Sequence, residues 1–258
     1  MAGQMPYRAS GCEKRHKTQS LKAGHKSKEE VVAMTEKRNI IIRLETAKDY
    51  REVEELTREA FWNLHVPGCD EHFLVHLLRG HEDFIPELDF VAVIDGRLAG
   101  NIMYSRSKVI SQEGIEHQVL TFGPLSVLPE FQKQGVGSAL IGHSAKAARS
   151  MGYEAVLIYG DPEYYSRFGF RPAEAFSITT AEGSFHPALQ ALELTAHALV
   201  GITGRFCESP VYHMDAGEAA AFDSSFTPRA KFVTESQLRF AKLAGLPVPE
   251  LPESEILK

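Results

Sequence analysis

Two glycines, one residue apart, stand where a strand-like run gives way to a helix-like run, in the stretch Gln-Lys-Gln-Gly-Val-Gly-Ser. The first turn of a helix leaves backbone N–H groups without intrahelical partners, and the helix dipole makes that end positive. Glycine would let this backbone approach an anion with no Cβ in the way. The stretch therefore predicts a phosphate or pyrophosphate site. The residues that would contact the anion are Gln132, Lys133, Gln134, Gly135, Val136, Gly137 and Ser138.

Two other phosphate-binding patterns fit this stretch less well. The dinucleotide fingerprint G-x-G-x-x-G needs a third glycine, but Leu140 occupies that position. The fingerprint also expects an acidic residue at the end of the next strand, whereas Glu154 stands at its start. A Walker loop of the form G-x-x-x-x-G-K-[ST] is absent. The pattern that fits is Q-x-x-G-x-G, after a strand and at the opening of a helix.

The strand-like run before the glycines is interrupted by Gly123 and Pro124. Proline cannot donate to a strand ladder and glycine marks bulges, so we expect this strand to part from its neighbour. The freed backbone groups of Leu125, Ser126 and Val127 could then pair with the amides of a ligand. A pantetheine arm carries two amides and ends in a thiol. The combination with a pyrophosphate site therefore predicts a coenzyme A site.

A third chemical feature is the aromatic cluster in "GDPEYYSRFGF", residues 160–170. Phe168 and Phe170 are expected to pack on the edge of the sheet. Tyr164 and Tyr165 differ from them because a tyrosine O–H can donate a proton to a leaving thiolate.

The elements that position these residues follow from apolar periodicity. A strand over 39–44, helices over 49–62 and 70–80, and a hairpin over 89–105 around Asp95-Gly96 precede the site. A strand over 115–129, a helix from 135 that stops at Gly152, and a buried strand over 153–160 form it. This order predicts a mixed α/β sheet. After Phe170 the signals weaken: 177–183 and 191–200 read as strands or as a strand and a helix, and 234–245 as a short helix.

In this order and spacing, the motifs resemble the GNAT superfamily of acyl-CoA N-acyltransferases. The stretch "VLPEFQKQGVGSALI" resembles its main acetyl-CoA motif and "GDPEYYSRFGF" its following motif; with "GPLSVLP" they are similar to the YhbS-like subgroup of predicted acetyltransferases. The resemblance covers about residues 40–175. It implies a central, mostly antiparallel sheet with flanking helices and a V-shaped opening between strands four and five. Acetyl-CoA would lie there, its pyrophosphate on residues 132–138 and its pantetheine along 125–127.

The resemblance also implies direct acetyl transfer to a primary amine of a small molecule or protein, without a metal. The family pattern places a tyrosine four residues before the glycine of Gly-Phe, so Tyr165 is the predicted general acid. Glu71 and Glu87 are candidate bases, with a plain surface role as the alternative for each. Trp62 and His65 are candidate acceptor-pocket residues by fold analogy. A non-catalytic acyl-CoA sensor or partner module is the alternative function.

His72 and His76 have the i, i+4 spacing of a metal pair, but no HExxH pattern accompanies them. We therefore interpret them as exposed or partly packed histidines and predict no metal site.

Composition limits the remaining possibilities. The 258 residues contain no apolar run near the ~20 residues that span a bilayer, and only three cysteines, which fits a reducing cytoplasm without a disulfide framework. Residues 1–38 carry nine Lys or Arg and four Glu, whereas the whole chain has a net charge of −6. An acidic body disfavours nucleic-acid binding, although the basic head keeps that alternative open.

The predicted domain organisation has three parts. Residues 1–38 form a basic, flexible extension, residues 39–175 the acetyltransferase core, and residues 176–258 a C-terminal extension that packs on the core. The extension could cover a sheet edge within one subunit or between two, so a homodimer stays open.

Overall fold

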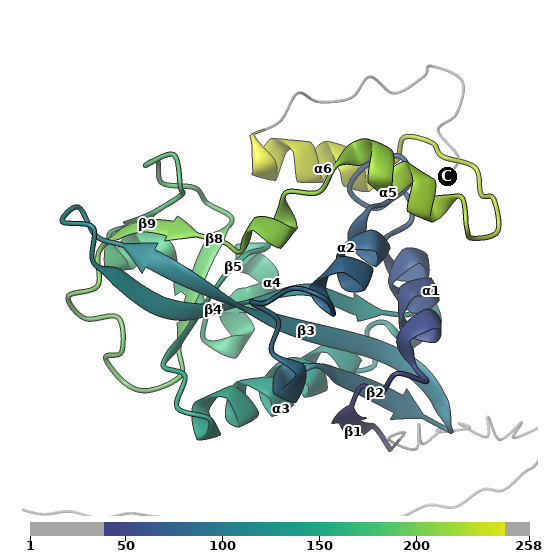
Figure 1. Ribbon diagram of the computed structural model, residues 1–258, viewed down its shortest axis with the longest axis horizontal. Helices are drawn as coiled ribbons and strands as arrows, with labels where there is room; N and C mark the ends of the chain where they lie inside the picture. The colour runs from purple at the N-terminus through teal and green to yellow at the C-terminus, as the bar shows by residue number, and fades with distance from the viewer. Residues whose placement is uncertain (1–38, 246–258) are drawn as a thin grey trace, which may run out of the picture. The chain divides into compact units, whose positions relative to one another are not determined.

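A mixed sheet of nine strands organises the part of the chain that the computed structural model describes, residues 39–245 (Figure 1). The predicted basic extension, residues 1–38, and the last part of the predicted C-terminal extension, residues 246–258, lie outside these residues. The strands are β1 (Ile41–Leu44), β2 (Phe90–Ile94), β3 (Arg97–Ile110), β4 (Glu116–Val127), β5 (Ala155–Tyr159), β6 (Arg171–Pro172), β7 (Ile178–Thr179), β8 (Leu189–Glu193) and β9 (Gly204–Cys207). The helices are α1 (Tyr50–Phe61), α2 (Glu71–Leu78), α3 (Val136–Ser150), α4 (Pro162–Tyr165), α5 (Ala216–Asp223) and α6 (Glu235–Ala244).

The order along the sheet is β1-β2-β3-β4-β5-β8-β6, and β9 pairs with both β3 and β7. Only β4–β5 and β7–β9 are parallel among the described pairs. The predicted mixed, mostly antiparallel sheet is therefore confirmed.

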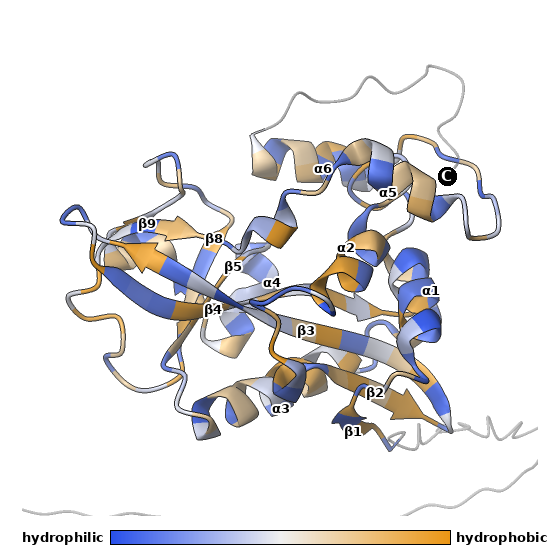
Figure 2. Cartoon of the chain, in the orientation of Figure 1, coloured by the Kyte–Doolittle hydropathy of each residue, from blue (hydrophilic) through white to orange (hydrophobic). Residues whose placement is uncertain are grey.

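Helices cover both faces of the sheet because the central strands are apolar on both sides. Along β2, Phe90 and Ala92 join the core under α3, while Val91 joins the core under α1 and α2. Figure 2 shows β2 as hydrophobic, whereas α1 mixes hydrophobic residues with polar ones. This alternation with a period of two fixes the register of β2 against its neighbouring strands. A slip by one residue would turn the side chains of one face of the sheet to the other face. No helix within residues 39–245 has the length and hydrophobicity that crossing a bilayer requires.

Strands β4 and β5 part after a single paired position, Leu120 with Val156. Further along β4, the register with β3 shifts between Phe122 and Leu125, so that Gly123 and Pro124 form a bulge opposite β3. The bulge predicted from these two residues is confirmed. Beyond it, β4 runs away from β5 and leaves the V-shaped opening that the resemblance implied.

The C-terminal segment completes the sheet and then covers α1 and α2. Strand β8 pairs with β5, and β9 pairs with β3. Helix α5 contacts α1 through Asp223, whose Oδ1 lies 2.7 Å from Nε of Arg58. Helix α6 is bound to the α1–α2 loop, where Gln237 Nε2 donates to Asn63 O at 3.0 Å and Ser236 Oγ donates to Leu64 O at 2.8 Å.

Candidate functional site

The paired glycines stand at the start of α3, as predicted. Gly135 is the N-cap residue and has φ 88°, in the left-handed region that favours glycine. Gly137 lies in the first turn, and a Cβ there would sit 2.8 Å from the hydroxyl oxygen of Tyr164. The backbone conformation therefore favours glycine at position 135, and a side chain at position 137 would have to displace the Tyr164 hydroxyl.

A cavity of about 620 Å³ lies against this loop. Eight of the ten predicted cofactor-contacting residues line it: Leu125, Val127, Gln132, Lys133, Gly135, Val136, Gly137 and Ser138. Arg167 also lines it, so two cationic residues, Lys133 and Arg167, lie in the wall of the cavity beside the start of α3. Positive charge beside a helix N-terminus suits a phosphate group.

Ser126 and Gln134, the other two predicted residues, line neither this cavity nor the larger one beyond it. Ser126 is buried and its hydroxyl lies 2.9 Å from the hydroxyl of Thr57 on α1. The side-chain amide of Gln134 turns back and donates to Glu130 O.

The backbone of β4 presents alternate residues to the opening. Leu128 N–H donates to Ala99 O at 3.0 Å, and Ser126 stands opposite Asn101 of β3. In an antiparallel pair this alternation directs the N–H and C=O groups of Leu125 and Val127 away from β3, towards the opening. The geometry thus supports ligand pairing for Leu125 and Val127, and not for Ser126.

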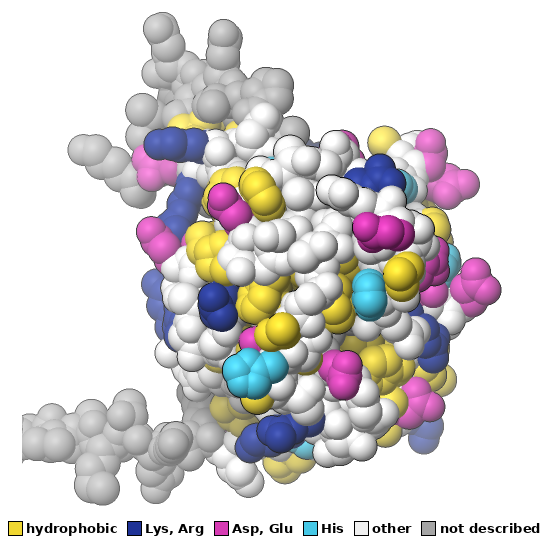
Figure 3. All heavy atoms as spheres, turned by 90° about the vertical axis from the view of Figure 1, so that its left-hand side faces the viewer, with side chains coloured by type: hydrophobic (Ala, Val, Ile, Leu, Met, Phe, Trp, Pro, Cys, Tyr) yellow, Lys and Arg dark blue, Asp and Glu magenta, His cyan; other side chains and the backbone are white. Residues whose placement is uncertain are grey.

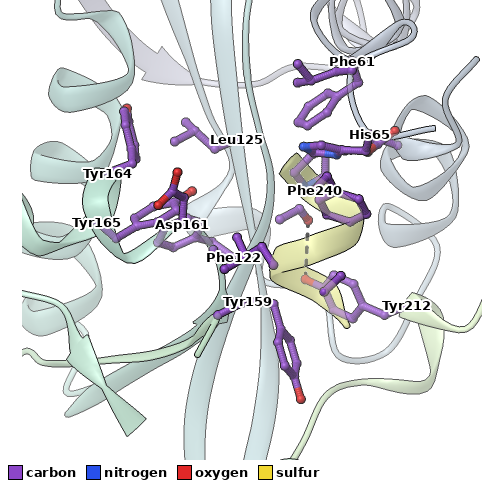
Figure 4. A pocket seen from close by; sticks show the side chains of 18 of the residues that line it. Phe61, His65, Phe122, Leu125, Tyr159, Asp161, Tyr164, Tyr165, Tyr212 and Phe240 are labelled. Carbon is purple, nitrogen blue, oxygen red and sulfur yellow. Dashed lines mark hydrogen bonds and ion pairs between the residues drawn. The ribbon is translucent and has the colours of Figure 1, made fainter. Parts of the chain in front are cut away.

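A second cavity of about 830 Å³ lies beyond the opening. The two cavities adjoin each other, because five residues line both: Phe61, Leu64, Leu125, Tyr164 and Tyr165. Figure 4 shows the two tyrosines on one side and Phe61, His65 and Phe240 on the other. On the face that carries β8 and β9, hydrophobic side chains gather with acidic and histidine side chains among them (Figure 3).

The two neighbouring tyrosines occupy different parts of the site. The hydroxyl of Tyr164 faces Gly137 in the glycine loop. The ring of Tyr165 instead packs beside Phe122 of β4, with 6.0 Å between ring centroids, next to the bulge. Burial, reinforced by the nearby Tyr164, raises the pKa of Tyr165. Tyr165 is therefore a protonated phenol at the junction of the cavities.

The structure places some of the residues predicted for the acceptor side at the larger cavity and others away from it. His65 and Glu71 both line the larger cavity, where His65 Nδ1 lies 3.1 Å from Glu71 Oε1 and the His65 ring stacks on Phe240 at 4.4 Å. Glu87 is exposed on the turn Pro86–Leu88 and lines neither cavity. Trp62 lines neither as well; its indole N–H donates to Ala230 O at 3.0 Å. The structure thus brings only His65 and Glu71 to the site.

Sequence reasoning missed the residues that the C-terminal segment supplies. Tyr212 places its hydroxyl 3.2 Å from Ser105 Oγ and 3.4 Å from Gly123 O in the bulge. Glu208 lines the larger cavity, and burial raises its pKa to about 7. Arg239 of α6 lies 2.6 Å from Asp161 Oδ2 and ties α6 to the start of α4. The patterns in this part of the sequence were too weak to predict these positions.

His72 and His76 make separate structural contacts. His72 is buried, and its Nε2 lies 3.2 Å from Asp223 Oδ1 without hydrogen-bond geometry. Burial lowers the pKa of His72 to about 4. His76 Nδ1 lies 3.0 Å from Glu54 Oε1. Within residues 39–245, no group of three or more His, Cys, Asp and Glu side chains is arranged to hold a metal ion.

Comparisons with known proteins agree with this geometry. Residues 87–172 match the family described as "Acetyltransferase (GNAT) domain". The uncharacterized N-acetyltransferase YhbS of Escherichia coli K12 is 32% identical over 166 residues, which cover 64% of this chain and 93% of YhbS. A second uncharacterized N-acetyltransferase of that strain, YjhQ, is 34% identical over 126 residues, covering 49% of this chain and 65% of YjhQ.

Two solved structures are similar over most of the described chain. The crystal structure of E. coli YhbS in complex with CoA has a TM-score of 0.61 and 29% identity, covering 69% of this chain and 93% of that one. A GNAT acetyltransferase from Brucella melitensis in complex with acetyl-CoA has a TM-score of 0.54 and 26% identity, covering 68% and 99%. The fold, the sequence motifs and these relatives together show that the chain belongs to the GNAT family of acetyltransferases.

Proposed function

We propose that this protein is an acetyl-CoA-dependent N-acetyltransferase that transfers acetyl directly to a primary amine of a small molecule or protein. The observation that carries the proposal is that the two cavities adjoin each other at Leu125 of β4 and at Tyr164 and Tyr165 of α4. The smaller cavity has free backbone N–H groups at a helix start and two cationic residues, as a diphosphate site needs. The larger cavity has room for an acceptor.

The first cavity accounts for cofactor binding. The diphosphate of acetyl-CoA would rest on the N–H groups of residues 132–138, with Lys133 and Arg167 adding positive charge. The pantetheine amides would pair with Leu125 and Val127, whose polar backbone groups face the opening. YhbS and the Brucella enzyme are solved with CoA and acetyl-CoA, which supports this assignment.

The reaction would take place where the two cavities adjoin, and it consists of attack by the amine, loss of the thiolate and proton transfer. The neutral amine attacks the thioester carbonyl, and a β4 backbone N–H beyond the bulge stabilises the resulting oxyanion. The C–S bond then breaks, Tyr165 gives its hydroxyl proton to the leaving sulfur, and the resulting phenolate takes a proton from the nitrogen of the new amide. The raised pKa of Tyr165 keeps that proton available at neutral pH.

The proposal also divides the chain into a core and an extension that contributes to the site. Residues 39–175 would form the acetyltransferase core, and the C-terminal extension would complete the acceptor side. Support comes from Glu208, Tyr212, Arg239 and Phe240, which lie outside that core range and line the larger cavity.

The proposal is tested by measuring CoA release from acetyl-CoA with a panel of primary amines, beside acetyl-CoA binding by calorimetry. Binding with amine-dependent CoA release is the expected result. Tight binding without release on any amine would favour the non-catalytic acyl-CoA sensor. Absence of binding would exclude both functions.

A further inference from the structure

Glu208 lies at the acceptor side of the larger cavity. Strand β9 ends at Cys207, which pairs with Lys108 of β3, and Glu208 is the next residue. The following turn, Pro210–Tyr212, brings the hydroxyl of Tyr212 to 3.4 Å from Gly123 O in the β4 bulge. Tyr212 and Tyr159 both interact electrostatically with Glu208. Glu208 thus stands just before the turn that contacts the β4 bulge, and it lines the larger cavity together with Tyr159 and Tyr212.

The carboxylate of Glu208 lacks a protein partner. Among residues 39–245, no hydrogen bond or ion pair engages it, and burial alone raises its pKa to about 7. The other carboxylates of this cavity are occupied, Glu71 by His65 at 3.1 Å and Asp161 by Arg239 at 2.6 Å. Glu208 is half-buried, and an unpaired carboxylate that is shielded from water in this way is unfavourable, so a cationic ligand would relieve its cost.

The surroundings of Glu208 are aromatic rather than cationic. Tyr159 of β5 and Tyr212 line the same cavity, and His186 packs edge-on against Tyr159 with 5.9 Å between ring centroids. The other titratable groups near Tyr159 are Glu182 and Cys207. Aromatic faces around a carboxylate favour a cation with an apolar body.

We propose that Glu208 binds the ammonium group of a small cationic primary amine with an aromatic or hydrophobic body, and accepts its proton before attack. The inference rests on the proposed acetyl transfer and names its acceptor class. The body of the amine would lie against the aromatic walls formed by Tyr159, Tyr212 and Phe240.

Two protein groups, Glu208 and Tyr165, account for the protons that move in the reaction. The ammonium nitrogen gives one proton to Glu208, and its freed lone pair forms the N–C bond. As the C–S bond breaks, Tyr165 protonates the sulfur and regains a proton from the nitrogen of the new amide. Glu208 passes its proton to solvent, which accounts for the one proton released in each turnover.

The test measures amine binding and acetyl transfer in parallel on the full chain. Calorimetry with CoA present compares wild type, Glu208→Gln and the exposed control Glu182→Gln at about pH 8, where Glu208 is ionised. The probes are 2-phenylethylamine, tryptamine, hexylamine and the uncharged 2-phenylethanol. We expect Glu208→Gln to bind the amines about tenfold more weakly, with 2-phenylethanol and the control unaffected. We also expect kcat/KM for the amines to fall about 100-fold while acetyl-CoA affinity stays unchanged.

The outcomes separate this inference from the proposed function. Amine binding that depends on Glu208 without any CoA release would uphold the recognition role and contradict acetyl transfer. Acetylation by Glu208→Gln with wild-type kcat/KM would uphold the transferase and overturn the role of Glu208. Failure of every amine to bind wild type would also overturn it. Because the pKa of Glu208 is about 7, wild-type kcat/KM for the amines should rise as the pH passes 7. His65→Gln tests the rival base: if this substitution removes the rise and Glu208→Gln does not, His65 is the base.

Discussion

Gly160 and Tyr165 are fitted to each other. The Tyr165 ring occupies the space of a side chain at position 160, where a Cβ would lie 2.6 Å from ring atom Cδ2. Gly160 directly follows β5 and Tyr165 ends α4, so the chain folds the phenol back over the end of the strand. The absence of a side chain at position 160 thus positions the proposed general acid beside Phe122 and the opening.

Replacing Tyr165 by phenylalanine should lower kcat about 100-fold, because it removes the proton donor and keeps the ring packing. Acetyl-CoA affinity should not change. Steady-state kinetics and calorimetry measure the two effects, with Tyr153→Phe as a control outside both cavities. Since burial raises the pKa of Tyr165, wild-type kcat should not fall as the pH passes about 10, the ordinary value for tyrosine. Full activity of Tyr165→Phe would remove Tyr165 from the mechanism.

Alanine at position 160 should reproduce the kinetic loss without touching the phenol itself. The new methyl group would displace the Tyr165 ring from its place over β5. The matched control is Gly142→Ala in α3, where a Cβ would meet no atom within 4 Å. That control should retain kcat and gain about 1 kcal/mol in the free energy of unfolding, since alanine favours a helix. Equal kcat in both variants would show that the fit between Gly160 and Tyr165 is unimportant.

Glutamine at position 208 should stabilise the fold in a pH-dependent way. The folded pKa of Glu208 is about 7, raised by burial from the ordinary 4.5. As the pH rises from 4.5 to 7, the unfolded chain ionises first, so the folded state loses up to about 3 kcal/mol relative to it. Glu208→Gln avoids this loss. Its free energy of unfolding should exceed that of wild type at about pH 8 and match it near pH 4. A difference independent of pH would mean that Glu208 titrates normally.

Removing Asp223 should loosen α5 from α1 and α2. Arg58 and Asp223 have side chains that are only 6% and 14% exposed, so Asp223→Ala leaves a nearly buried guanidinium without its partner. We expect a loss of about 3 kcal/mol in urea unfolding. Glu218→Ala, an exposed position on the same helix, is the control. Equal stability of the two variants would show that this ion pair does not fasten α5.

The cavity wall at the start of α3 could be predicted from sequence because its signals are local. Three features are each encoded within a few residues of sequence: the glycine with positive φ, the start of the helix, and the strand interrupted by Gly123 and Pro124. Tyr165 followed from a motif of the same short range. Glu87 failed to reach the site because its turn buries Leu88 and directs Glu87 to the surface.

His65 and Glu71 of the larger cavity were predicted, but the residues that the C-terminal extension adds to it could not be, for a physical reason. Strands of two to five residues, such as β7 and β8, are too short to show alternation. The contact between Tyr212 and Gly123 joins residues 89 positions apart, so only the sheet topology creates it. No sequence pattern surrounds Glu208 that could have predicted its role. Its environment arises only where the end of β9 lies beside residues of β4 and β5 in the larger cavity.

The central claim is that the backbone at the start of α3 binds the diphosphate of acetyl-CoA. Calorimetry of acetyl-CoA binding to wild type, Gly137→Val and Gly142→Val tests it most directly, because one substitution fills the glycine loop and the other points to solvent on the same helix. We predict binding by wild type and by Gly142→Val, and affinity about tenfold or more weaker for Gly137→Val. Equal affinity of the three proteins, or no binding to any of them, would contradict the claim.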